Sequence, residues 1–522
     1  MDLPALLAAL SEPAPYPRPG PVEVRQTHIS VVFLVGDTAY KIRKPVNLGF
    51  VDFSTLEKRK HDCDEEVRLN RRLAPSVYRG VVPITVDNGQ LRMAGSGVPV
   101  EWAVEMVRLP EEATLKQRLA RDEVTREQIE SVARRVAEFH RTADRGAHIS
   151  RYGHFDVVAG NAGENFAQMK THVGVTVRPP MYDRVRELTE KALADLKQLI
   201  ESRAVRNLPC DTHGDLHLSH VYLFPDREPP DDLVIIDCIE FAERYRFADP
   251  VADIAFLVMD LAYLGRRDLA RACADTYFAA MGDNEGRALL DFYVAYRAIV
   301  RAKVKGIKAS EPEVTEYERL EGRLTATAHW WLALGTLEEP LQRPALVLVG
   351  GLPGTGKSTL SRGLAQAANF TFIRADEIRK ELAGVPVNEK AEGIYTDWWT
   401  HQTYLECGLR ANRILEAGGR VLVDATFHSG VHRAVFLDPA DFLSIPAVFF
   451  VCQADPALVR ERLRARRDDA SDADEKVYEE LAARWTTAMP RRYELQTVEI
   501  DTTDAGRALE QALTALRAIG LA

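Results

Sequence analysis

Apolar and polar positions alternate with the period of a β-strand once the chain leaves a Pro-rich lead-in. Residues 29–35 and 38–42 are rich in β-branched side chains and flank a Gly-Asp pair, which predicts a β-hairpin with Lys41 on its second strand. A capping box that begins at Ser54 then predicts a helix with Glu66 near its middle. The pattern therefore places a lysine on a strand and a glutamate on the helix that follows.

Longer periodic segments occupy the middle of the chain. Residues 100–110 alternate as a strand, and residues 125–142 repeat apolar side chains at helical spacing. His140, near the end of that helix, is expected to pack rather than to catalyse. Residues 233–237 form a short apolar strand that ends in a carboxylate, and a mostly helical pattern then continues to about residue 334. An α+β domain is therefore expected in the N-terminal half.

Strands and helices alternate after residues 335–344, a stretch that we interpret as a linker. Such alternation is typical of a parallel sheet covered by helices on both faces. The predicted strands are 347–349, 371–373, 420–424, 447–451 and 497–500, and the predicted helices begin near 358, 377, 396 and 456. The expected domains are thus residues 1–338, of α+β class, and residues 339–522, of α/β class.

Composition narrows the class of protein without naming an activity. The 522 residues carry a formal net charge of −10 and have a pI near 5.8, so they lack the basic excess typical of proteins that bind duplex DNA or RNA. The six cysteines form no Cys-x-x-Cys pair, which favours buried thiols in a reducing cytosol over disulfides or a zinc site. No apolar segment reaches the ~18 residues of a membrane span, and the first ten residues make a poor signal peptide. We therefore expect a cytoplasmic protein without a membrane partner.

The stretch from Val347 to Leu360 carries the most specific motif. A β-branched strand leads into Gly-x-x-x-x-Gly-Lys-Ser, which then opens a helix. Glycines let the backbone direct its N–H groups at phosphate oxygens, and the helix N-terminus adds partial positive charge. Lys357 is placed to reach the β- and γ-phosphates of ATP and Ser358 to ligate Mg²⁺, and we expect the lysine to face solvent in the empty site. The residues predicted to bind phosphate are Gly351, Gly354, Thr355, Gly356, Lys357, Ser358 and Thr359.

A second candidate site lies in the N-terminal half, in the stretch His-Gly-Asp-Leu-His-Leu-Ser-His that ends at His220. A carboxylate in such a loop can accept the proton of a hydroxyl, and a carboxylate at a strand end can hold a metal ion. The motif resembles the catalytic loop of the aminoglycoside phosphotransferase family, which shares the protein-kinase-like fold. The resemblance implies Lys41 and Glu66 as ATP-binding residues, Asp215 as the catalytic base, and Asp237 and His220 as metal ligands.

The N-terminal half departs from this family at two points. No Gly-x-Gly-x-x-Gly precedes Lys41, and Thr27-His28-Ile29-Ser30 stands in its place. His220 occupies the position of an asparagine, and an imidazole nitrogen favours Mn²⁺ or later transition metals where an amide oxygen suits Mg²⁺. Three alternatives stay open for this half: slow catalysis, the use of another metal, and a binding module with vestigial chemistry. For His220 itself, the alternative to metal binding is a hydrogen bond to the catalytic loop.

The acceptor side of the C-terminal half is indicated by Asp376 and Arg379. They follow the second predicted strand at the carboxyl edge of the sheet, where ligands bind in open α/β folds. The stretch resembles the Asp-Asp-x-x-Arg-type motif of phage polynucleotide kinase, gluconate kinase, chloramphenicol phosphotransferase and zeta toxins. It implies that Asp376 is the general base and that Arg379 steadies the phosphoryl group or the acceptor, with a helix N-cap as the alternative role of Asp376. Asp424 ends an apolar strand in the Walker B manner, to hold a Mg²⁺-bound water or to position Arg379.

Arginines recur between residues 460 and 467, on a predicted helix that runs into an acidic stretch. This arrangement is typical of a mobile lid that closes on phosphates when ATP binds. Arg460 and Arg464 share one helix face, so we favour them over Arg466 and Arg467 as ATP-binding residues. A solvated helix with i,i+4 ion pairs explains the same pattern.

Nearly the whole chain thus resembles bacterial fusions of an aminoglycoside-phosphotransferase-like domain with a P-loop kinase domain of the zeta-toxin and polynucleotide-kinase group. The resemblance implies a two-lobed protein-kinase-like fold, a P-loop NTPase fold, and a bifunctional ATP- and Mg²⁺-dependent phosphotransferase that acts on hydroxyls of small molecules. In a second hypothesis the C-terminal half phosphorylates a 5′-hydroxyl of nucleic acid and the N-terminal half recruits substrate. A third hypothesis is a regulatory ATPase without an acceptor. The sequence names neither the acceptor nor the oligomeric state.

Overall fold

The computed structural model describes residues 2–49, 51–87, 89–311, 314–387, 389, 391, 393–465, 471–485 and 497–522. The chain divides into two compact units. The first comprises Met1–Gly163, Leu193–Leu261 and Arg266–Arg297, and the second comprises Glu164–Ala192, Ala262–Gly265 and Ala298–Ala522. The second unit thus includes helical segments that precede residue 339, and the domain boundary expected at 338/339 stays a prediction.

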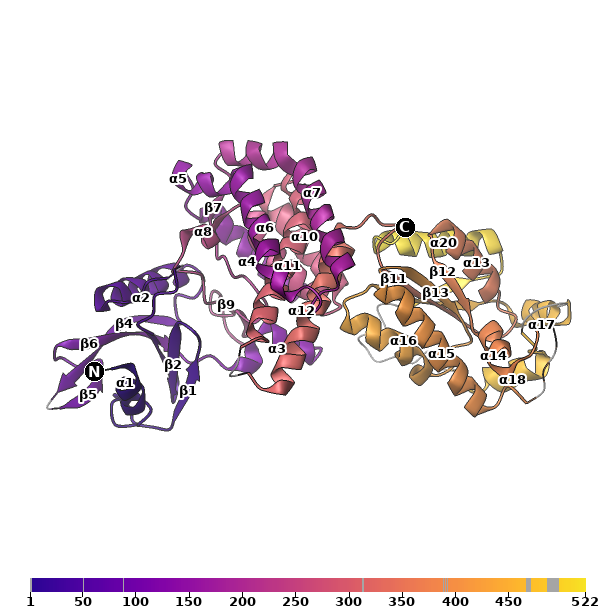
Figure 1. The fold of residues 1–522 in the computed structure, drawn as a ribbon, viewed down its shortest axis with the longest axis horizontal. Coiled ribbons are helices and arrows are strands. Elements are labelled where there is room, and N and C mark those ends of the chain that lie inside the picture. Colours follow the sequence, from indigo (N-terminus) through magenta and orange to yellow (C-terminus); the bar gives the residue numbers. More distant parts are fainter. Residues whose placement is uncertain are drawn as a thin grey trace. The chain divides into compact units, whose positions relative to one another are not determined.

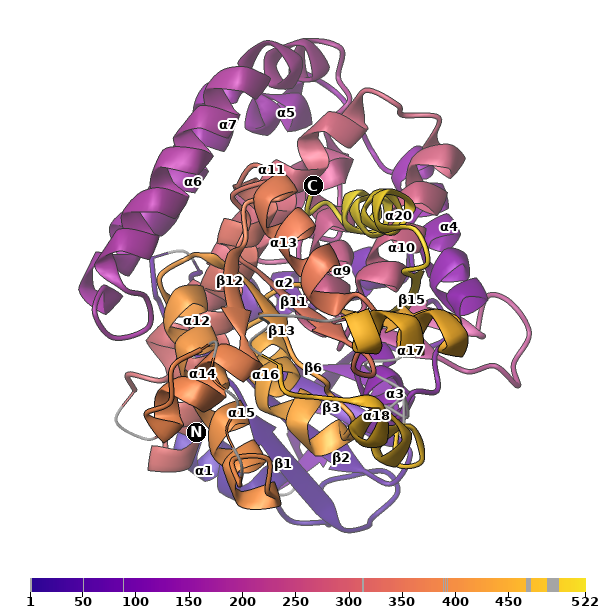
Figure 2. The ribbon, with the colours of Figure 1, turned by 90° about the vertical axis from the view of Figure 1, so that its right-hand side faces the viewer.

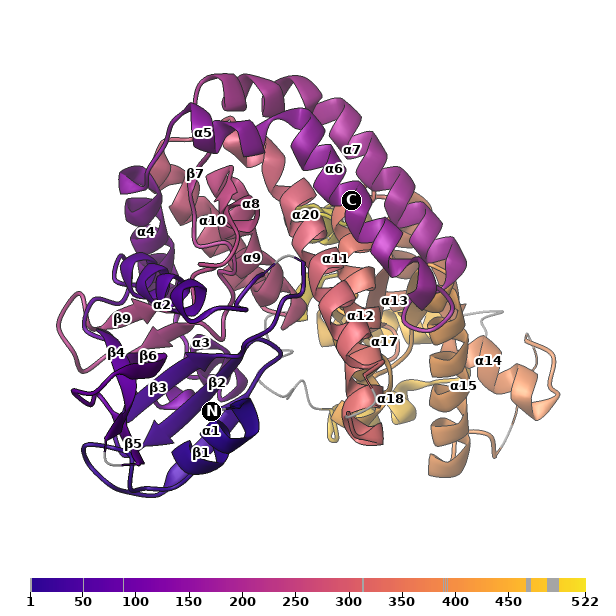
Figure 3. The same cartoon turned by 60° about the vertical axis from the view of Figure 1, so that its left-hand side comes forward.

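An antiparallel sheet forms the N-terminal part of the first unit (Figure 3). Its strands are β1 (Val22–Gln26), β2 (Ser30–Val35), β3 (Thr38–Arg43), β4 (Tyr78–Asp87), β5 (Gln90–Met93) and β6 (Pro99–Val107). They lie in the order β1-β2-β3-β6-β4-β5. The register pairs Val35 with Thr38 and Val32 with Lys41, which confirms the predicted hairpin.

Helix α2 (Leu56–Asn70) packs against β4 and β6 of this sheet. Its N-cap is Thr55, whose hydroxyl accepts a hydrogen bond from a backbone amide one turn later. The predicted capping box at Ser54 is therefore wrong, because the Ser54 hydroxyl instead donates to Asp52 in the preceding turn. The shift of one residue still leaves Glu66 in the helix, fully buried.

Helices make up most of the remainder of the first unit. Helix α4 (Arg126–Thr142) confirms the predicted amphipathic segment, and His140 is fully buried in it, as predicted. Strand β9 (Leu233–Ile235) pairs with β8 (Val221–Leu223) and ends two residues before Asp237. The other elements up to residue 308 are α1 (Leu3–Leu10), α3 (Leu115–Ala120), α5 (Ala147–Ser150), α6 (Phe155–Met169), α7 (Pro179–Val205), α8 (Glu243–Arg246), α9 (Pro250–Tyr263), α10 (Arg267–Met281), α11 (Leu290–Lys308), β7 (Cys210–Asp211) and β10 (Phe247–Ala248), with 3-10 turns at Glu111–Ala113, Arg151–Gly153, Lys170–His172 and Gly286–Leu289.

A parallel sheet forms the core of the second unit. Its strands are β11 (Ala345–Gly350), β12 (Thr371–Arg374), β13 (Arg420–Asp424), β14 (Ala447–Gln453) and β15 (Thr497–Asp501), and its helices are α13 (Lys357–Ala367), α14 (Ala375–Ala383), α15 (Asp397–Glu416), α16 (Gly430–Phe442), α17 (Pro456–Ala465), α18 (Glu475–Ala482) and α20 (Ala505–Ala518). The strand order is β12-β13-β11-β14-β15. Helices α13 and α20 cover one face, where Val347 and Val349 enter their apolar core, and α15 and α16 cover the other (Figure 1 and Figure 2). The predicted α/β alternation is confirmed.

Helix α12 (Glu316–Leu337) ends inside the predicted linker, so the expected start of that linker at Gly335 is wrong. The connection to β11 is residues 338–344, and side chains hold it in place. Glu338 accepts two hydrogen bonds of 2.8 Å from Arg184, and Arg343 donates to the Glu338 carbonyl at 2.9 Å. Because Glu338 is only 6% exposed, this ion pair anchors the connection to α7.

Two predictions from composition can be compared with the fold. All six cysteines carry buried, free thiols, as predicted. None of the described helices combines the length and the apolar character that a membrane crossing requires.

Candidate functional sites

Lys41 lies at the centre of the first site. Its ammonium donates to Glu66 Oε1 at 2.9 Å and to Asp237 Oδ1 at 3.1 Å. Burial alone would lower the pKa of Lys41, but Asp237 and Glu66 outweigh burial and raise that pKa. The Lys41 charge in turn lowers the pKa of Asp237. The structure thus brings together a cation and two carboxylates that are widely separated in the sequence, as the kinase-like arrangement requires.

Arg43 is a second cation in this cluster, two residues along the same strand face. Its guanidinium is 1% exposed and contacts Asp62, Glu66 and Glu240. Burial raises the pKa of Glu240 to about 8, and Arg43 opposes that rise. Glu66 is therefore held from both sides, by Lys41 and by Arg43. Sequence reasoning missed Arg43. The available signal was its position two residues after Lys41, which places both side chains on the same face of a strand.

Helix α9 fixes the loop that carries Asp215. Asp253 accepts hydrogen bonds from the backbone N–H groups of His213 at 2.9 Å and Gly214 at 3.0 Å, and Asp260 accepts one from a third loop amide at 3.1 Å. Both aspartates are buried in an otherwise apolar helix and seven residues apart, so they lie on one face. A buried carboxylate requires partners, and that requirement was the overlooked sequence signal for their role.

Asp215, His217 and His220 gather in this loop, with ligand atoms within 4.8 Å of one another. His220 Nδ1 lies 3.0 Å from the Asp215 carbonyl oxygen, so Nδ1 must carry the proton and donate it. The other nitrogen, His220 Nε2, faces Asp237 Oδ2 at 3.4 Å. Burial lowers the pKa of His220 to about 4, and His217 adds to that lowering, so the ring is neutral at neutral pH. His220 therefore hydrogen-bonds the loop and also turns a nitrogen lone pair toward Asp237.

The loop between β11 and α13 has the backbone that a phosphate-binding loop requires. Gly351, Gly354 and Gly356 have φ angles of 141°, 80° and 86°. At Gly351 an added Cβ would lie 2.6 Å from the Cys452 carbonyl oxygen, so a side chain there is excluded. The Thr355 hydroxyl donates to a carbonyl of the same loop at 2.7 Å. These glycines are needed for the shape of the loop, whatever it binds.

Lys357, Ser358 and Thr359 form the first turn of α13. The Lys357 ammonium donates to the Leu352 carbonyl at 3.0 Å, and the side chain is half-buried, so the prediction that it faces solvent is wrong. The Ser358 hydroxyl donates to Asp424 Oδ2 at 2.5 Å. Burial raises the pKa of Asp424, while Lys357 and Ser358 oppose the rise. Thr359 is exposed. The hydroxyl and the carboxylate predicted to serve one metal ion are therefore in direct contact.

Asp376 and Arg379 lie on α14, which begins where β12 ends. The N-cap of α14 is Arg374, so the alternative role of Asp376 as a helix cap is wrong, and Asp376 lies half-buried in the first turn. Arg379 is buried and donates to the Thr400 hydroxyl at 3.2 Å. The arginine beside Asp424 is Arg374, whose Nε lies 4.0 Å from Oδ2, rather than Arg379.

The predicted lid arginines on α17 pair with acids on α18. Arg464 Nε lies 2.9 Å from Glu475, and Arg460 Nη2 lies 4.0 Å from Glu479. Residues 466–470, which include Arg466 and Arg467, lie outside the described residues. ATP binding by Arg460 and Arg464 therefore stays a prediction that requires these ion pairs to open.

Arg462 lies two residues from both Arg460 and Arg464, and so on a different face of α17. It has the position beside the loop of Lys357 that was predicted for its two neighbours. It lines a cavity of about 420 Å³ together with Lys357 and Ser358. Its Nη2 donates to the Thr502 carbonyl at 2.9 Å, while its buried Nη1 has no hydrogen-bond partner among the described residues. That Nη1 lies 3.5 Å from where a Cβ on Gly356 would stand. Sequence reasoning missed Arg462 because the run of arginines does not show which face of the helix points toward the loop.

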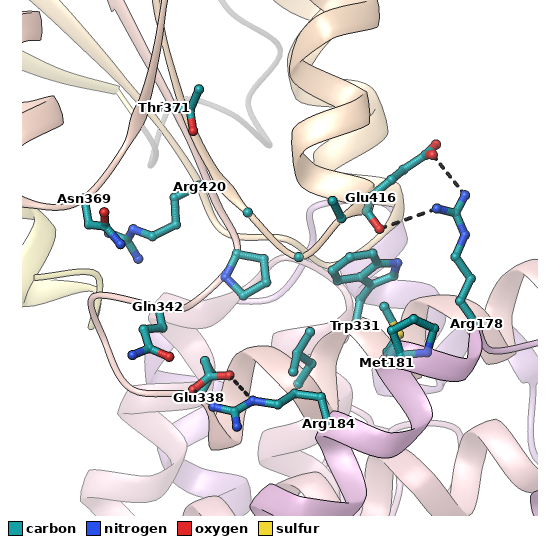
Figure 4. A pocket seen from close by; sticks show the side chains of 16 residues that line it. Arg178, Met181, Arg184, Trp331, Glu338, Gln342, Asn369, Thr371, Glu416 and Arg420 are labelled. Atoms are coloured by element: carbon teal, nitrogen blue, oxygen red, sulfur yellow. Dashed lines mark hydrogen bonds and ion pairs between the residues drawn. The ribbon is translucent and has the colours of Figure 1, made fainter.

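A larger cavity, of about 750 Å³, lies at the opposite edge of the parallel sheet (Figure 4). Its lining includes Thr371 and Arg420, the first residues of β12 and β13. The phosphate-type loop, residues 351–356, instead follows the last residue of β11. The ion pair between Arg178 and Glu416, with a contact of 2.9 Å, borders it (Figure 4). This cavity is therefore separate from the loop that carries Lys357.

Known proteins match the C-terminal part of the chain by itself and nearly the whole chain. The family model described as "AAA domain" matches residues 346–487. "Uncharacterized protein Rv2004c" of Mycobacterium tuberculosis (strain ATCC 25618 / H37Rv) and "Uncharacterized protein Mb2027c" of Mycobacterium bovis (strain ATCC BAA-935 / AF2122/97) are each 33% identical over 474 residues, which cover 89% of this chain and 91% of the relative. The chain belongs to the family of these proteins. Within that family its fold joins a kinase-like N-terminal part to a C-terminal P-loop domain.

Solved structures of kinases are similar to each part at low identity. A gluconokinase from Sinorhizobium meliloti 1021 is 20% identical, with a TM-score of 0.26, and covers 34% of this chain and 95% of its own. A glucosamine kinase in complex with glucosamine, ADP and inorganic phosphate is 14% identical, with a TM-score of 0.34, and covers 59% of this chain and 74% of its own. A choline/ethanolamine kinase family protein from Mesorhizobium loti is 13% identical, with a TM-score of 0.34, and covers 61% of this chain and 92% of its own.

Proposed function

We propose that the chain is an ATP-dependent phosphotransferase with one phosphoryl-transfer site in each half, acting on hydroxyl groups of small molecules. The observation that carries this proposal is the contact of Ser358 with Asp424 at the head of the loop. A hydroxyl and a carboxylate 2.5 Å apart, beside Lys357, are the oxygen ligands and the cation that a Mg²⁺–nucleotide complex requires. The match of residues 346–487 to the AAA domain model supports the same nucleotide chemistry.

In the C-terminal half, the loop N–H groups and Lys357 bind the β- and γ-phosphates, and Ser358 and Asp424 hold the metal ion. Mg²⁺ bound there would neutralise charge on the phosphates during transfer. Asp376 takes the proton of the acceptor hydroxyl, because it is half-buried and lies at the carboxyl edge of the sheet. Arg379 positions the acceptor or the transferred group.

In the N-terminal half, Lys41 binds the α- and β-phosphates, and Glu66 holds Lys41 in place. Asp237 and His220 fit a divalent cation, because a carboxylate oxygen and an imidazole nitrogen face each other at 3.4 Å. Asp215 takes the proton of the acceptor, since its side chain is 36% exposed and its loop is fixed by α9. The protonated Asp215 carboxyl group then releases the proton to solvent, because its side chain is partly exposed.

ATP turnover by the full chain, with sugars, aminoglycosides, nucleosides and oligonucleotides as acceptors, tests this proposal. Asp215→Ala and Asp376→Ala should each slow transfer to a different set of acceptors, and the double variant should slow transfer to both sets. Transfer only to oligonucleotide 5′-hydroxyls, sensitive to Asp376→Ala alone, would instead support the nucleic-acid hypothesis. ATP hydrolysis that no acceptor changes would support the regulatory ATPase.

A further inference from the structure

The candidate metal site of the N-terminal half contains two electron-rich atoms that face each other. His220 Nδ1–H donates to the Asp215 carbonyl, which leaves Nε2 as the atom with a lone pair. Nε2 lies 3.4 Å from Asp237 Oδ2, and the other oxygen of that carboxylate, Oδ1, is already bound to Lys41. A lone pair and a carboxylate oxygen repel each other unless a metal ion or a proton lies between them.

The separation of these two atoms suits ligands of one metal ion. Two neighbouring ligands at bond lengths of about 2.1 Å lie roughly 3.0 Å apart in octahedral geometry and roughly 3.4 Å apart in tetrahedral geometry. The backbone supports the arrangement, because Asp237 has a left-handed φ of 65° and its amide donates to the Tyr78 hydroxyl at 3.3 Å. Strained backbone at a non-glycine residue is typical of positions where a side chain is held for function.

His217 lies close to the same atoms but has the opposite proton arrangement. Its Nδ1 accepts a hydrogen bond from the Ser219 amide at 3.3 Å, so its proton sits on Nε2, which points at Asp215 Oδ2 at 3.5 Å. The imidazole rings of His217 and His220 are in contact at an interplanar angle of 35°, with centroids 3.6 Å apart. His217 therefore offers a donor to Asp215, whereas His220 offers a lone pair to Asp237.

We propose that Asp237 and His220 form a mixed carboxylate–imidazole site that binds a first-row transition-metal ion, such as Mn²⁺ or Zn²⁺, in preference to Mg²⁺. The inference rests on the proposed N-terminal site and adds its metal class. Both Mn²⁺ and Zn²⁺ accept an imidazole nitrogen more readily than Mg²⁺ does, because Mg²⁺ prefers oxygen ligands. In the C-terminal half both candidate ligands, Ser358 and Asp424, are oxygen donors. The two halves of one chain are thus expected to prefer different metals.

Pulsed electron paramagnetic resonance of bound Mn²⁺ tests the nitrogen ligand directly, without any measurement of activity. The full chain would be loaded with Mn²⁺ and inorganic tripolyphosphate, which contains no nitrogen. A ¹⁴N coupling is expected in the wild type and in His217→Asn, and it should be lost in His220→Asn. Calorimetry with Mn²⁺ and Mg²⁺ in an Asp424→Asn background should show that His220→Asn lowers the ratio of the two affinities by at least about tenfold.

Each other outcome overturns the inference. A wild type without ¹⁴N coupling would mean that no histidine binds the ion, and a coupling lost only in His217→Asn would make His217 the ligand. A coupling retained in both variants would place the nitrogen elsewhere. Circular dichroism of each variant checks that the fold is retained. A chain that shows the His220 coupling but transfers no phosphoryl group would retain this metal site and refute the proposed function alone.

Discussion

Lys41 of the first unit and Lys357 of the second are the two lysines that we assign to phosphate binding, and they have different partners. Lys41 is clamped between Glu66 and Asp237, from a helix and a loop that are distant in sequence. Lys357 donates to the Leu352 carbonyl, five residues away in its own loop. The first lysine depends on tertiary packing for its position, whereas a local turn positions the second. This difference predicts that mutations will affect folding and binding differently in the two halves.

The largest effect expected is the loss of a nucleotide site in Lys357→Ala. The side chain supplies the cation for the β- and γ-phosphates, and it donates to a carbonyl of its own loop rather than to a distant element. ATP calorimetry on the full chain should fall from two sites to one, with an unchanged circular dichroism spectrum. If both sites persist with unchanged affinity, the assignment of the loop is wrong.

Loss of the candidate bases should slow transfer without preventing ATP binding. Asp376→Ala should reduce phosphoryl transfer by the C-terminal half about 10²- to 10⁴-fold, the usual contribution of a general base. Asp215→Ala should do the same for acceptors of the N-terminal half. Steady-state rates with each acceptor, and ATP affinity as the control, separate catalysis from binding. An unchanged rate in either variant would remove that residue from the mechanism.

The stability of Lys41→Met, compared with that of Lys357→Ala, tests whether the two lysines differ in structural importance. The change leaves Glu66, which is fully buried, with one cation fewer, so the first unit should lose about 3–5 kcal/mol of stability. Lys357→Ala should change stability by less than about 0.5 kcal/mol. Hydrogen-exchange mass spectrometry of residues 56–70, in α2, reads the first unit specifically. Equal protection of α2 in the two variants would show that Lys41 is not structural.

The smallest effect concerns the arginines of α17. Arg462→Gln should weaken ATP binding by the C-terminal half about 10- to 100-fold, because a charged hydrogen bond contributes roughly 1.5–3 kcal/mol. Arg464→Gln is the matched control, since Arg464 pairs with Glu475. Its affinity should stay within about twofold of the wild type. A larger loss in Arg464→Gln would mean that the lid rearranges on binding and that the sequence-based choice of Arg464 was right.

Much of the C-terminal fold was predictable because its signals are local. The strand over 420–424 and the start of a helix near 396 were expected close to their observed positions, since β-branched runs and helical periodicity extend over single segments. The errors lie at element ends, as at Ser54 and Gly335. The residue at which a helix begins or ends depends on one or two hydrogen bonds, which the sequence pattern does not specify.

By itself, the sequence determined the loop from Gly351 to Ser358, because eight neighbouring residues fix both its backbone and its chemistry. It also determined the hairpin that carries Lys41 and the α/β alternation of the C-terminal half, whereas helices α16, α18 and α20 were not predicted. Only the tertiary structure decided which carboxylates meet Lys41, that Asp253 and Asp260 hold the Asp215 loop, and that Arg462 faces the phosphate-type loop. The reason is physical: these contacts join segments far apart in sequence, and buried charges choose partners by packing in three dimensions, which no local pattern encodes.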